Sequence, residues 1–169
     1  MSKVINIVGY SSNVGKTLLI ENLIKELKSR GYSIATIKHD VHGFDIDKKV
    51  DVKTLMEKQW GLLSGGERKY LYSMIKELNE EIEFNDIIKL LLDKDIILVE
   101  GYKNSNLRKI EVYRSGVSDK IITPKEKIIA VASDINLNLE NIKVIDKNSI
   151  KELADLIEKE NEFKFEIYQ

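Results

Sequence analysis

Cysteine is missing from this chain of 169 residues. Its absence excludes disulfide bonds, zinc–thiolate centres, iron–sulfur clusters and thiol nucleophiles. Proline is represented only by Pro124, and no apolar run approaches the roughly 20 residues that a membrane-spanning helix needs. The apolar run in the opening MSKVINIVGY is too short for a signal peptide. We therefore expect a cytoplasmic protein that has no membrane segment.

An excess of one charge is also lacking, because 27 Lys and Arg stand against 28 Asp and Glu, for a net charge of -1. This balance gives no general electrostatic reason to expect nucleic acid or an acidic membrane as partner, so any anion site must be local. The chain is 43% hydrophobic and 33% charged, which is typical of a globular domain. We expect one domain over residues 1–160, followed by a C-terminal tail at 161–169.

Hydrophobic periodicity alternates between strand and helix patterns along the chain. It predicts a three-layer, Rossmann-like α/β fold with a mostly parallel sheet. The segment at 9–17, described below, makes this the fold of a phosphate-loop NTPase. A capping box of Ser149 and Glu152 marks the start of the last helix. Strands are expected at 4–8, 33–39, 96–99, 109–114, 128–132 and 142–145, and helices at 16–30, 52–59, 85–92 and after residue 149.

A β-hairpin inserted at 61–74 interrupts this pattern, because Gly65 and Gly66 lie between two strand-like segments and suit a turn with positive φ angles. Aromatic residues and Met are enriched at protein interfaces. The hairpin is therefore a candidate surface for homodimer formation, and the alternative is that its large side chains fill the core. The side chains concerned are Tyr70, Leu71, Tyr72 and Met74.

The strongest chemical signal is the segment GYSSNVGKT at 9–17, between a predicted strand and a predicted helix. Backbone N–H groups at a helix N-terminus, together with the helix dipole, bind phosphate. In this interpretation Lys16 bridges the β- and γ-phosphates and Thr17 is a ligand of Mg²⁺. The candidate nucleotide-binding residues are Gly9, Ser12, Asn13, Val14, Gly15, Lys16, Thr17 and Leu18.

Glu100 follows the apolar strand at 96–99, so its carboxylate is expected at the sheet edge where open α/β folds bind ligands. There it would hold the metal, and the alternative is a solvated surface glutamate. The segment IKHDVHGFDID at 37–47 begins at the same edge. Asp45 and Asp47 are further candidate metal ligands, and Lys38 could neutralise charge on a γ-phosphoryl oxygen. Lys16, Lys38 and Glu100 are thus the candidate catalytic residues.

Two other interpretations of these polar residues stay open. His39 and His42, close to Asp45, could form a transition-metal site, or the loop could simply hydrogen-bond its own turns. Asp134 follows the strand at 128–132, where its carboxylate could accept both N1–H and the 2-amino group of guanine. Alternatively, Asp134 caps a helix or a turn.

Four segments in addition to the phosphate loop resemble one family. IKHDVHGFDID, LVEGYK at 98–103, KIEVYR at 109–114 and IIAVASDINLNL at 128–139 are similar to the molybdopterin-guanine dinucleotide biosynthesis adapter family, MobB. The resemblance covers most of residues 3–158. It implies a usually dimeric GTP-binding protein with Mg²⁺ and at most slow GTP hydrolysis, which assists the molybdenum cofactor guanylyltransferase. The molybdenum insertion enzyme is a candidate further partner.

A second functional class is an ATP-dependent ligase of the dethiobiotin synthetase type. The segment at 9–17 is one residue longer than G-x-x-x-x-G-K-[ST], because Tyr10 stands where the first glycine would be, and it resembles the longer phosphate loop of that branch. A ligase must enclose a small substrate beside the γ-phosphate, whereas an adapter needs a surface for its partners. A small-molecule kinase is a third class, but the chain has only four arginines for the arginine-rich lid that such enzymes use.

Overall fold

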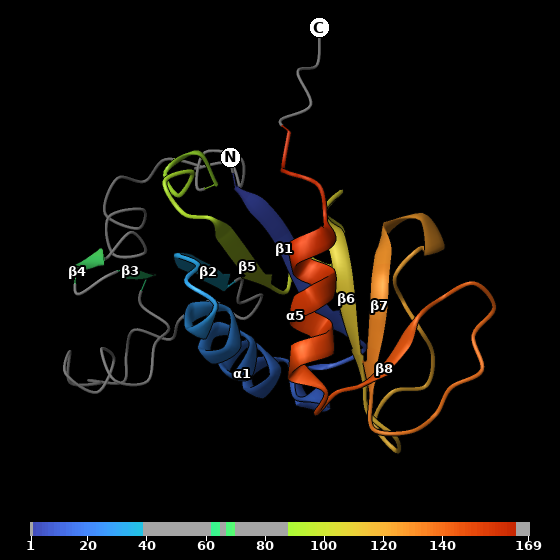
Figure 1. The fold of residues 1–169 in the computed structure, drawn as a ribbon. Coiled ribbons are helices and arrows are strands. Elements are labelled where there is room, and N and C mark those ends of the chain that lie inside the picture. The colour runs from blue at the N-terminus through green and yellow to red at the C-terminus, as the bar shows by residue number, and fades with distance from the viewer. Residues whose placement is uncertain (1, 39–61, 65–66, 70–87, 165–169) are drawn as a thin grey trace, which may run out of the picture.

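A six-stranded parallel sheet lies at the centre of the computed structural model, which describes residues 2–38, 62–64, 67–69 and 88–164 (Figure 1). Every neighbouring pair of strands in this sheet runs parallel. The predicted α/β fold with a mostly parallel sheet is confirmed. Across the sheet the strands follow the order β2 (Ile34–Lys38), β5 (Ile96–Glu100), β1 (Lys3–Gly9), β6 (Arg108–Tyr113), β7 (Ile128–Ser133) and β8 (Val144–Asp146).

The helices α1 (Lys16–Ser29) and α5 (Ile150–Lys159) lie side by side on one face of the sheet (Figure 1). Leu19, Leu23 and Leu27 recur every four residues, so they share one face of α1, which is buried on the sheet. Leu153 and Ile157 do the same on α5 and are fully buried. All five side chains belong to one apolar cluster, which therefore fixes both helices on the same face.

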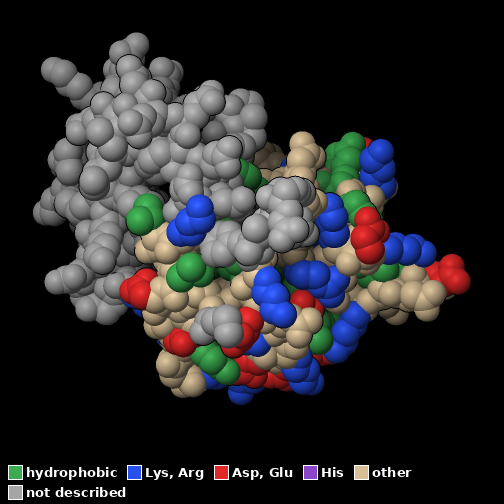
Figure 2. Space-filling view, turned by 90° about the horizontal axis from the view of Figure 1, so that it is seen from above, with side chains coloured by type: hydrophobic (Ala, Val, Ile, Leu, Met, Phe, Trp, Pro, Cys, Tyr) green, Lys and Arg blue, Asp and Glu red, His purple; other side chains and the backbone are tan. Residues whose placement is uncertain are grey.

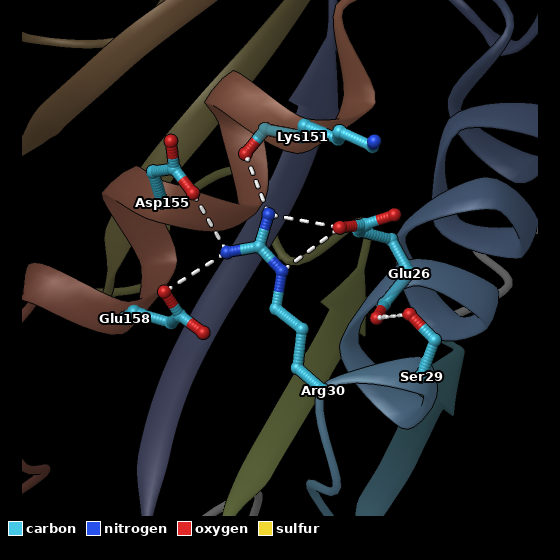
Figure 3. A network of polar contacts seen from close by, with 6 residues as sticks. All are labelled: Glu26, Ser29, Arg30, Lys151, Asp155 and Glu158. Atoms are coloured by element: carbon cyan, nitrogen blue, oxygen red, sulfur yellow. Dashed lines mark hydrogen bonds and ion pairs between the residues drawn. The ribbon is translucent and has the colours of Figure 1, made fainter.

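Arg30, at the C-terminal cap of α1, connects the two helices (Figure 3). Its guanidinium lies 2.7 Å from Asp155, 2.9 Å from Glu158 and 2.9 Å from Glu26, and it also donates to the carbonyl of Lys151 at 3.1 Å. The hydrogen bond that Arg30 donates to Asp155 is the largest of the causes that raise the pKa of Arg30. The contact orients the end of α1 against α5.

The opposite face of the sheet buries polar side chains as well as apolar ones. Lys109 is only 1% exposed, and its ammonium donates to the carbonyls of Ser105 at 2.5 Å and Leu107 at 2.9 Å. Burial lowers the pKa of Lys109 to about 8. Beside it, the fully buried Asn6 donates to the carbonyl of Tyr102 at 3.0 Å. These two side chains hold the segment at 101–107 against the sheet.

A second buried charge lies two residues further along β6. Glu111 is 1% exposed, and its carboxylate accepts the backbone N–H groups of Ile122 at 2.9 Å and Thr123 at 2.8 Å. The segment around Thr123 therefore also folds back over the sheet. Beside the start of β1, the N–H of Phe163 donates to the carbonyl of Ser2 at 2.8 Å, which brings two distant parts of the chain together.

The hairpin predicted near residue 65 is present as two antiparallel strands, β3 (Leu62–Ser64) and β4 (Glu67–Lys69). The predicted helix at 52–59, residues 85–87 of the predicted helix at 85–92 and the aromatic residues at 70–74 lie outside the described residues. Within the described part of the helix predicted at 85–92, residues 88–89 are helical and residues 90–92 form a turn. Ser149 is the N-cap of α5, but the predicted capping box is wrong, because Ser149 makes no side-chain capping hydrogen bond. Glu152 forms an ion pair with Lys143 at 3.0 Å instead.

Charges of both signs alternate over the described surface at the edge where the strands begin, with hydrophobic side chains in small groups (Figure 2). This distribution agrees with the balanced composition. Within residues 2–38, 62–64, 67–69 and 88–164, no helix has the length and apolar character to cross a membrane.

Candidate functional site

The loop at 9–17 connects the central strand β1 to α1, as the sequence predicted. After β1 the chain forms a 3-10 helix at Ser12–Val14, and Gly15 then leads into α1 with a φ of 99°. A side chain at Gly15 would meet nothing within 4 Å, so glycine is favoured here by the backbone conformation and not by lack of space. At Gly9 the requirement is steric, because an added Cβ would lie 2.4 Å from Cγ2 of Val14.

The side chain of Lys16 is held over this loop by a hydrogen bond to the loop backbone. Its ammonium donates to the carbonyl of Ser11 at 2.7 Å, and the residue is only 8% exposed. The hydroxyl oxygen of Ser11 is buried and has no hydrogen-bond partner among the described residues. Buried polar atoms are usually paired, so this hydroxyl is available for a ligand in the loop.

Thr17 and Glu100 meet at the β5 side of the loop. The Thr17 hydroxyl donates to Oε1 of Glu100 at 3.0 Å. Glu100 ends β5, the neighbour of β1, where it pairs in register with Ile7 of β1 and Lys38 of β2. The prediction that Glu100 lies at the sheet edge beside the phosphate loop is therefore correct in placement, and the surface-glutamate alternative is not supported by this contact.

Three of the remaining predicted residues of the loop line an open pocket of about 660 Å³, namely Ser12, Asn13 and Leu18. Val14 does not, because its side chain is 1% exposed and belongs to the apolar core, so only its backbone is available to a ligand. The complete lining consists of Ser12, Asn13, Gly15, Lys16, Thr17, Leu18, Glu21, Arg114 and Val117.

Arg114 and Val117 were missed by the sequence analysis. Both belong to the segment after β6, the strand that flanks β1 on the side opposite β5. Arg114 directly follows the last residue of β6. The rule that selected Glu100, a polar residue at the carboxyl end of a strand, also applies to Arg114 and could have found it.

Asp134 directly follows β7 and is occupied by protein donors. The N–H of Ser115 donates to Oδ1 at 2.8 Å, and the ammonium of Lys147 lies 3.4 Å from Oδ2. The bond from Ser115 is the largest cause that lowers the pKa of Asp134. Its carboxylate thus caps a turn, which is the alternative role that the sequence left open, and the contact with guanine stays a prediction.

The polar loop after β2 is not described beyond Lys38, whose backbone alone is placed. His39, His42, Asp45 and Asp47 lie outside the described residues, so the predicted roles of Asp45 and Asp47 as metal ligands stay predictions. Among the residues that are described, no group of three or more His, Asp or Glu side chains could hold a metal ion.

The segment after Glu100 also touches the phosphate loop. Lys103 donates to the carbonyl of Tyr10 at 2.9 Å, and Asn6 holds the carbonyl of Tyr102 from below. The phenol of Tyr10 lies beside the carboxylate of Asp119, and its hydrogen bond with Asp119 is the main cause that raises the pKa of Tyr10. The loop is thus supported by strands and segments on both sides.

Comparisons with known proteins agree with this architecture. The family model for molybdopterin guanine dinucleotide synthesis protein B, MobB, matches residues 4–134. A molybdopterin-guanine dinucleotide biosynthesis adapter protein of Escherichia coli is 32% identical over 159 residues, covering 86% of each chain. Its namesake of Haemophilus influenzae is 30% identical over 160 residues, covering 91% of this chain and 86% of that protein.

Solved structures share the fold. A MobB homologue from Bacillus stearothermophilus superposes with a TM-score of 0.56 at 20% identity, covering 94% of this chain and 99% of the other. Bacillus subtilis MobB superposes with a TM-score of 0.59 at 15% identity, with the same coverage. The resemblance of the four segments is therefore confirmed by the family model and by the curated relatives, and the chain belongs to the MobB family of molybdopterin guanine dinucleotide synthesis proteins.

Proposed function

We propose that this chain binds Mg²⁺ and GTP at its phosphate loop and acts as a cytoplasmic adapter in molybdopterin guanine dinucleotide biosynthesis. In this role it assists the guanylyltransferase that attaches GMP to molybdopterin, with the molybdenum insertion enzyme as a further partner. The observation that carries the nucleotide site is the loop itself, where Lys16, Thr17 and Glu100 converge. The choice of guanine and of the pathway depends on the family and on the names of the relatives.

The residues of the loop fit a phosphate chain. Lys16 already holds its charge at the loop through the carbonyl of Ser11, and the buried Ser11 hydroxyl has a hydrogen bond to donate. The N-terminus of α1 adds backbone N–H groups and the positive end of its dipole. The site therefore offers a charged donor, a hydroxyl and unpaired backbone donors within one loop.

The contact between Thr17 and Glu100 fits a magnesium ion. Because Thr17 gives its hydroxyl proton to Glu100, the lone pairs of its oxygen are left to face a cation. Magnesium prefers one or two protein oxygens together with phosphate oxygens and water, which this pair can supply. A bound Mg²⁺ would neutralise charge on the phosphate chain. The Glu100 carboxylate would order Thr17 and a metal-bound water.

The site supports binding more directly than rapid turnover, so we propose at most a slow GTPase. In that slow reaction Lys38 would neutralise charge at the γ-phosphate, and Asp45 and Asp47 would reach metal-bound water. We also propose a homodimer, on the basis of the hairpin predicted near residue 65. A strict monomer in sedimentation at tens of micromolar would contradict the dimer.

A thermal-shift and calorimetric comparison of GTP, GDP and ATP, each with and without Mg²⁺, tests the nucleotide site. A ligand present at 100 times its Kd stabilises the native state by about 2.7 kcal/mol. We expect GTP with Mg²⁺ to give the largest shift, and Lys16→Ala to abolish it without changing the unliganded melting temperature. Lys25→Ala, on the exposed face of the same helix, is the matched control and should behave as wild type.

Two results would overturn the proposal. If Lys16→Ala keeps the wild-type shift, the loop is not the binding site. If the pure protein rapidly turns over ATP with a small carboxylate, a ligase of the dethiobiotin synthetase type replaces the adapter.

A further inference from the structure

Arg114 lines the pocket from the end of β6, whereas Glu100 ends β5, on the other side of β1. Arg114 follows β6 directly, and together with Val117 it lines the pocket that Leu18 and Glu21 of α1 also line. Its Nη1 donates to the carbonyl of Asn13 at 3.0 Å, so the guanidinium touches the phosphate loop itself. No part of the nucleotide site proposed above uses this cation.

The turn that carries Arg114 is tied at several points. The N–H of Ser118 donates to the carbonyl of Arg114 at 2.8 Å, and the N–H of Arg114 donates to the Ser118 hydroxyl at 3.1 Å. The next residue, Ser115, donates its N–H to Asp134 at 2.8 Å. The backbone of Arg114 is therefore fixed before any ligand arrives, and Asp134, directly after β7, is one of the groups that fix it.

The guanidinium of Arg114 differs from the other arginines whose side chains are described. Arg30 binds three carboxylates, and Arg108, at the opposite end of β6, binds Glu160 at 3.1 Å. The Arg114 guanidinium forms no ion pair with any carboxylate of residues 2–38 or 88–164, and the acceptor that it contacts there is the neutral carbonyl of Asn13. An arginine whose planar fork of donors is unneutralised beside a phosphate loop is suited to an anionic ligand.

The strand order decides which part of the ligand Arg114 can reach. The loop follows β1, which has β5 on one side and β6 on the other. Thr17 and Glu100, the groups suited to the metal and the terminal phosphates, meet on the β5 side. Arg114 approaches from the β6 side and lines the same pocket as Leu18, which is one residue further into α1 than Thr17.

We infer that Arg114 binds the phosphate group nearest the ribose in the nucleotide held by the phosphate loop, and that Asp134 acts as a positioning residue by fixing the turn behind it. This inference rests on the proposed nucleotide site and assigns a new residue to it. It also gives Asp134 a role through Ser115 in place of a contact with the base.

The test measures Kd values of GTP and GDP, each with Mg²⁺, for wild type, Arg114→Gln and Arg114→Lys. Both nucleotides contain the phosphate nearest the ribose, so we expect Arg114→Gln to raise both Kd values by the same factor, about tenfold or more, since hydrogen bonds to charged groups are the strong ones. Arg114→Lys should keep part of the affinity, because it keeps the charge and loses the fork. Arg108→Gln, at the other end of the same strand, should leave both values unchanged.

Asp134→Ala provides the second arm. As a positioning residue it should raise the Kd of GTP and ATP by similar factors, and it should have no additional effect in the Arg114→Gln background. An Asp134→Ala variant that loses the preference for GTP over ATP, with an undiminished effect in the Arg114→Gln background, would show instead that Asp134 reads the base.

The outcomes separate this inference from the proposed function. Wild-type affinity of Arg114→Gln for both nucleotides would overturn the role of Arg114 while leaving the nucleotide site intact. If Arg114→Gln lost affinity for GTP alone, Arg114 would contact the terminal phosphate, and its placement at the phosphate nearest the ribose would be overturned. Failure of the wild-type protein to bind any nucleotide would contradict the proposed function itself. Unliganded melting temperatures of all variants establish that each is folded.

Discussion

Replacing Gly9 by alanine tests how tightly the phosphate loop is packed onto the sheet. The new Cβ would lie 2.4 Å from Cγ2 of Val14 and 3.1 Å from the carbonyl oxygen of Val112, whereas carbon atoms pack at about 3.5–4.0 Å. Val14 is 1% exposed and β-branched, so its side chain has little freedom to turn away. Overpacking of this kind costs about 1–3 kcal/mol, and we expect Gly9→Ala to lower the free energy of unfolding by that amount.

A second substitution shows whether Val14 is the cause. Val14→Ala alone removes two buried methyl groups and leaves a cavity, which costs about 2 kcal/mol. In the double variant the contact at 2.4 Å disappears, while the contact with the Val112 carbonyl persists. The loss in the double variant should therefore be smaller than the sum of the single losses by about 1–2 kcal/mol. Urea unfolding without nucleotide measures all three variants, and additive losses would refute this steric explanation.

Three further predictions concern neighbouring groups. Thr17→Ala should abolish the magnesium dependence of GTP binding while Thr17→Ser retains it, measured by titration with and without the metal; equal dependence in both would exclude the hydroxyl as a ligand. Glu100→Gln should keep nucleotide affinity but slow any GTP hydrolysis, and unchanged turnover would place the acidic role elsewhere. The pKa of Lys109 is lowered from 10.5 to about 8, so the unfolded chain binds more protons between these values and stability rises with pH there. Relative to Lys109→Met, wild type should gain up to about 3 kcal/mol of unfolding free energy from pH 8 to 10.5 in urea unfolding, and parallel profiles would contradict the shift.

Local signals predicted the phosphate loop and its supports well. The strand before Gly9, the phosphate-loop segment and the helix that follows it are all encoded in one continuous stretch of the chain. Glu100 could be placed because a residue that ends a buried strand must lie at the sheet edge. These features depend on sequence spacing alone, and they make up most of the candidate site.

What the sequence could not provide depends on contacts between distant segments. Periodicity does not reveal that β1 lies between β5 and β6, and without this order Arg114 could not be placed beside the loop. In β6 the charged residues Lys109 and Glu111 alternate with apolar ones, a pattern typical of a strand with one solvated face. The structure buries both faces, because the segments at 101–107 and 117–123 return over the charged side.

The central place of β1 has a consequence for how the chain folds during synthesis. The strand is made first, yet its partners β5 and β6 begin more than 90 residues later, at Ile96 and Arg108. Until those residues leave the ribosome, an apolar strand with two unpaired edges has nothing to pair with, and exposed edges of this kind favour aggregation. Pairings of such long sequence separation also slow folding. The central position of β1 supports the phosphate loop from both sides in the folded protein. For the same reason, the loop is among the last parts of the chain to become ordered.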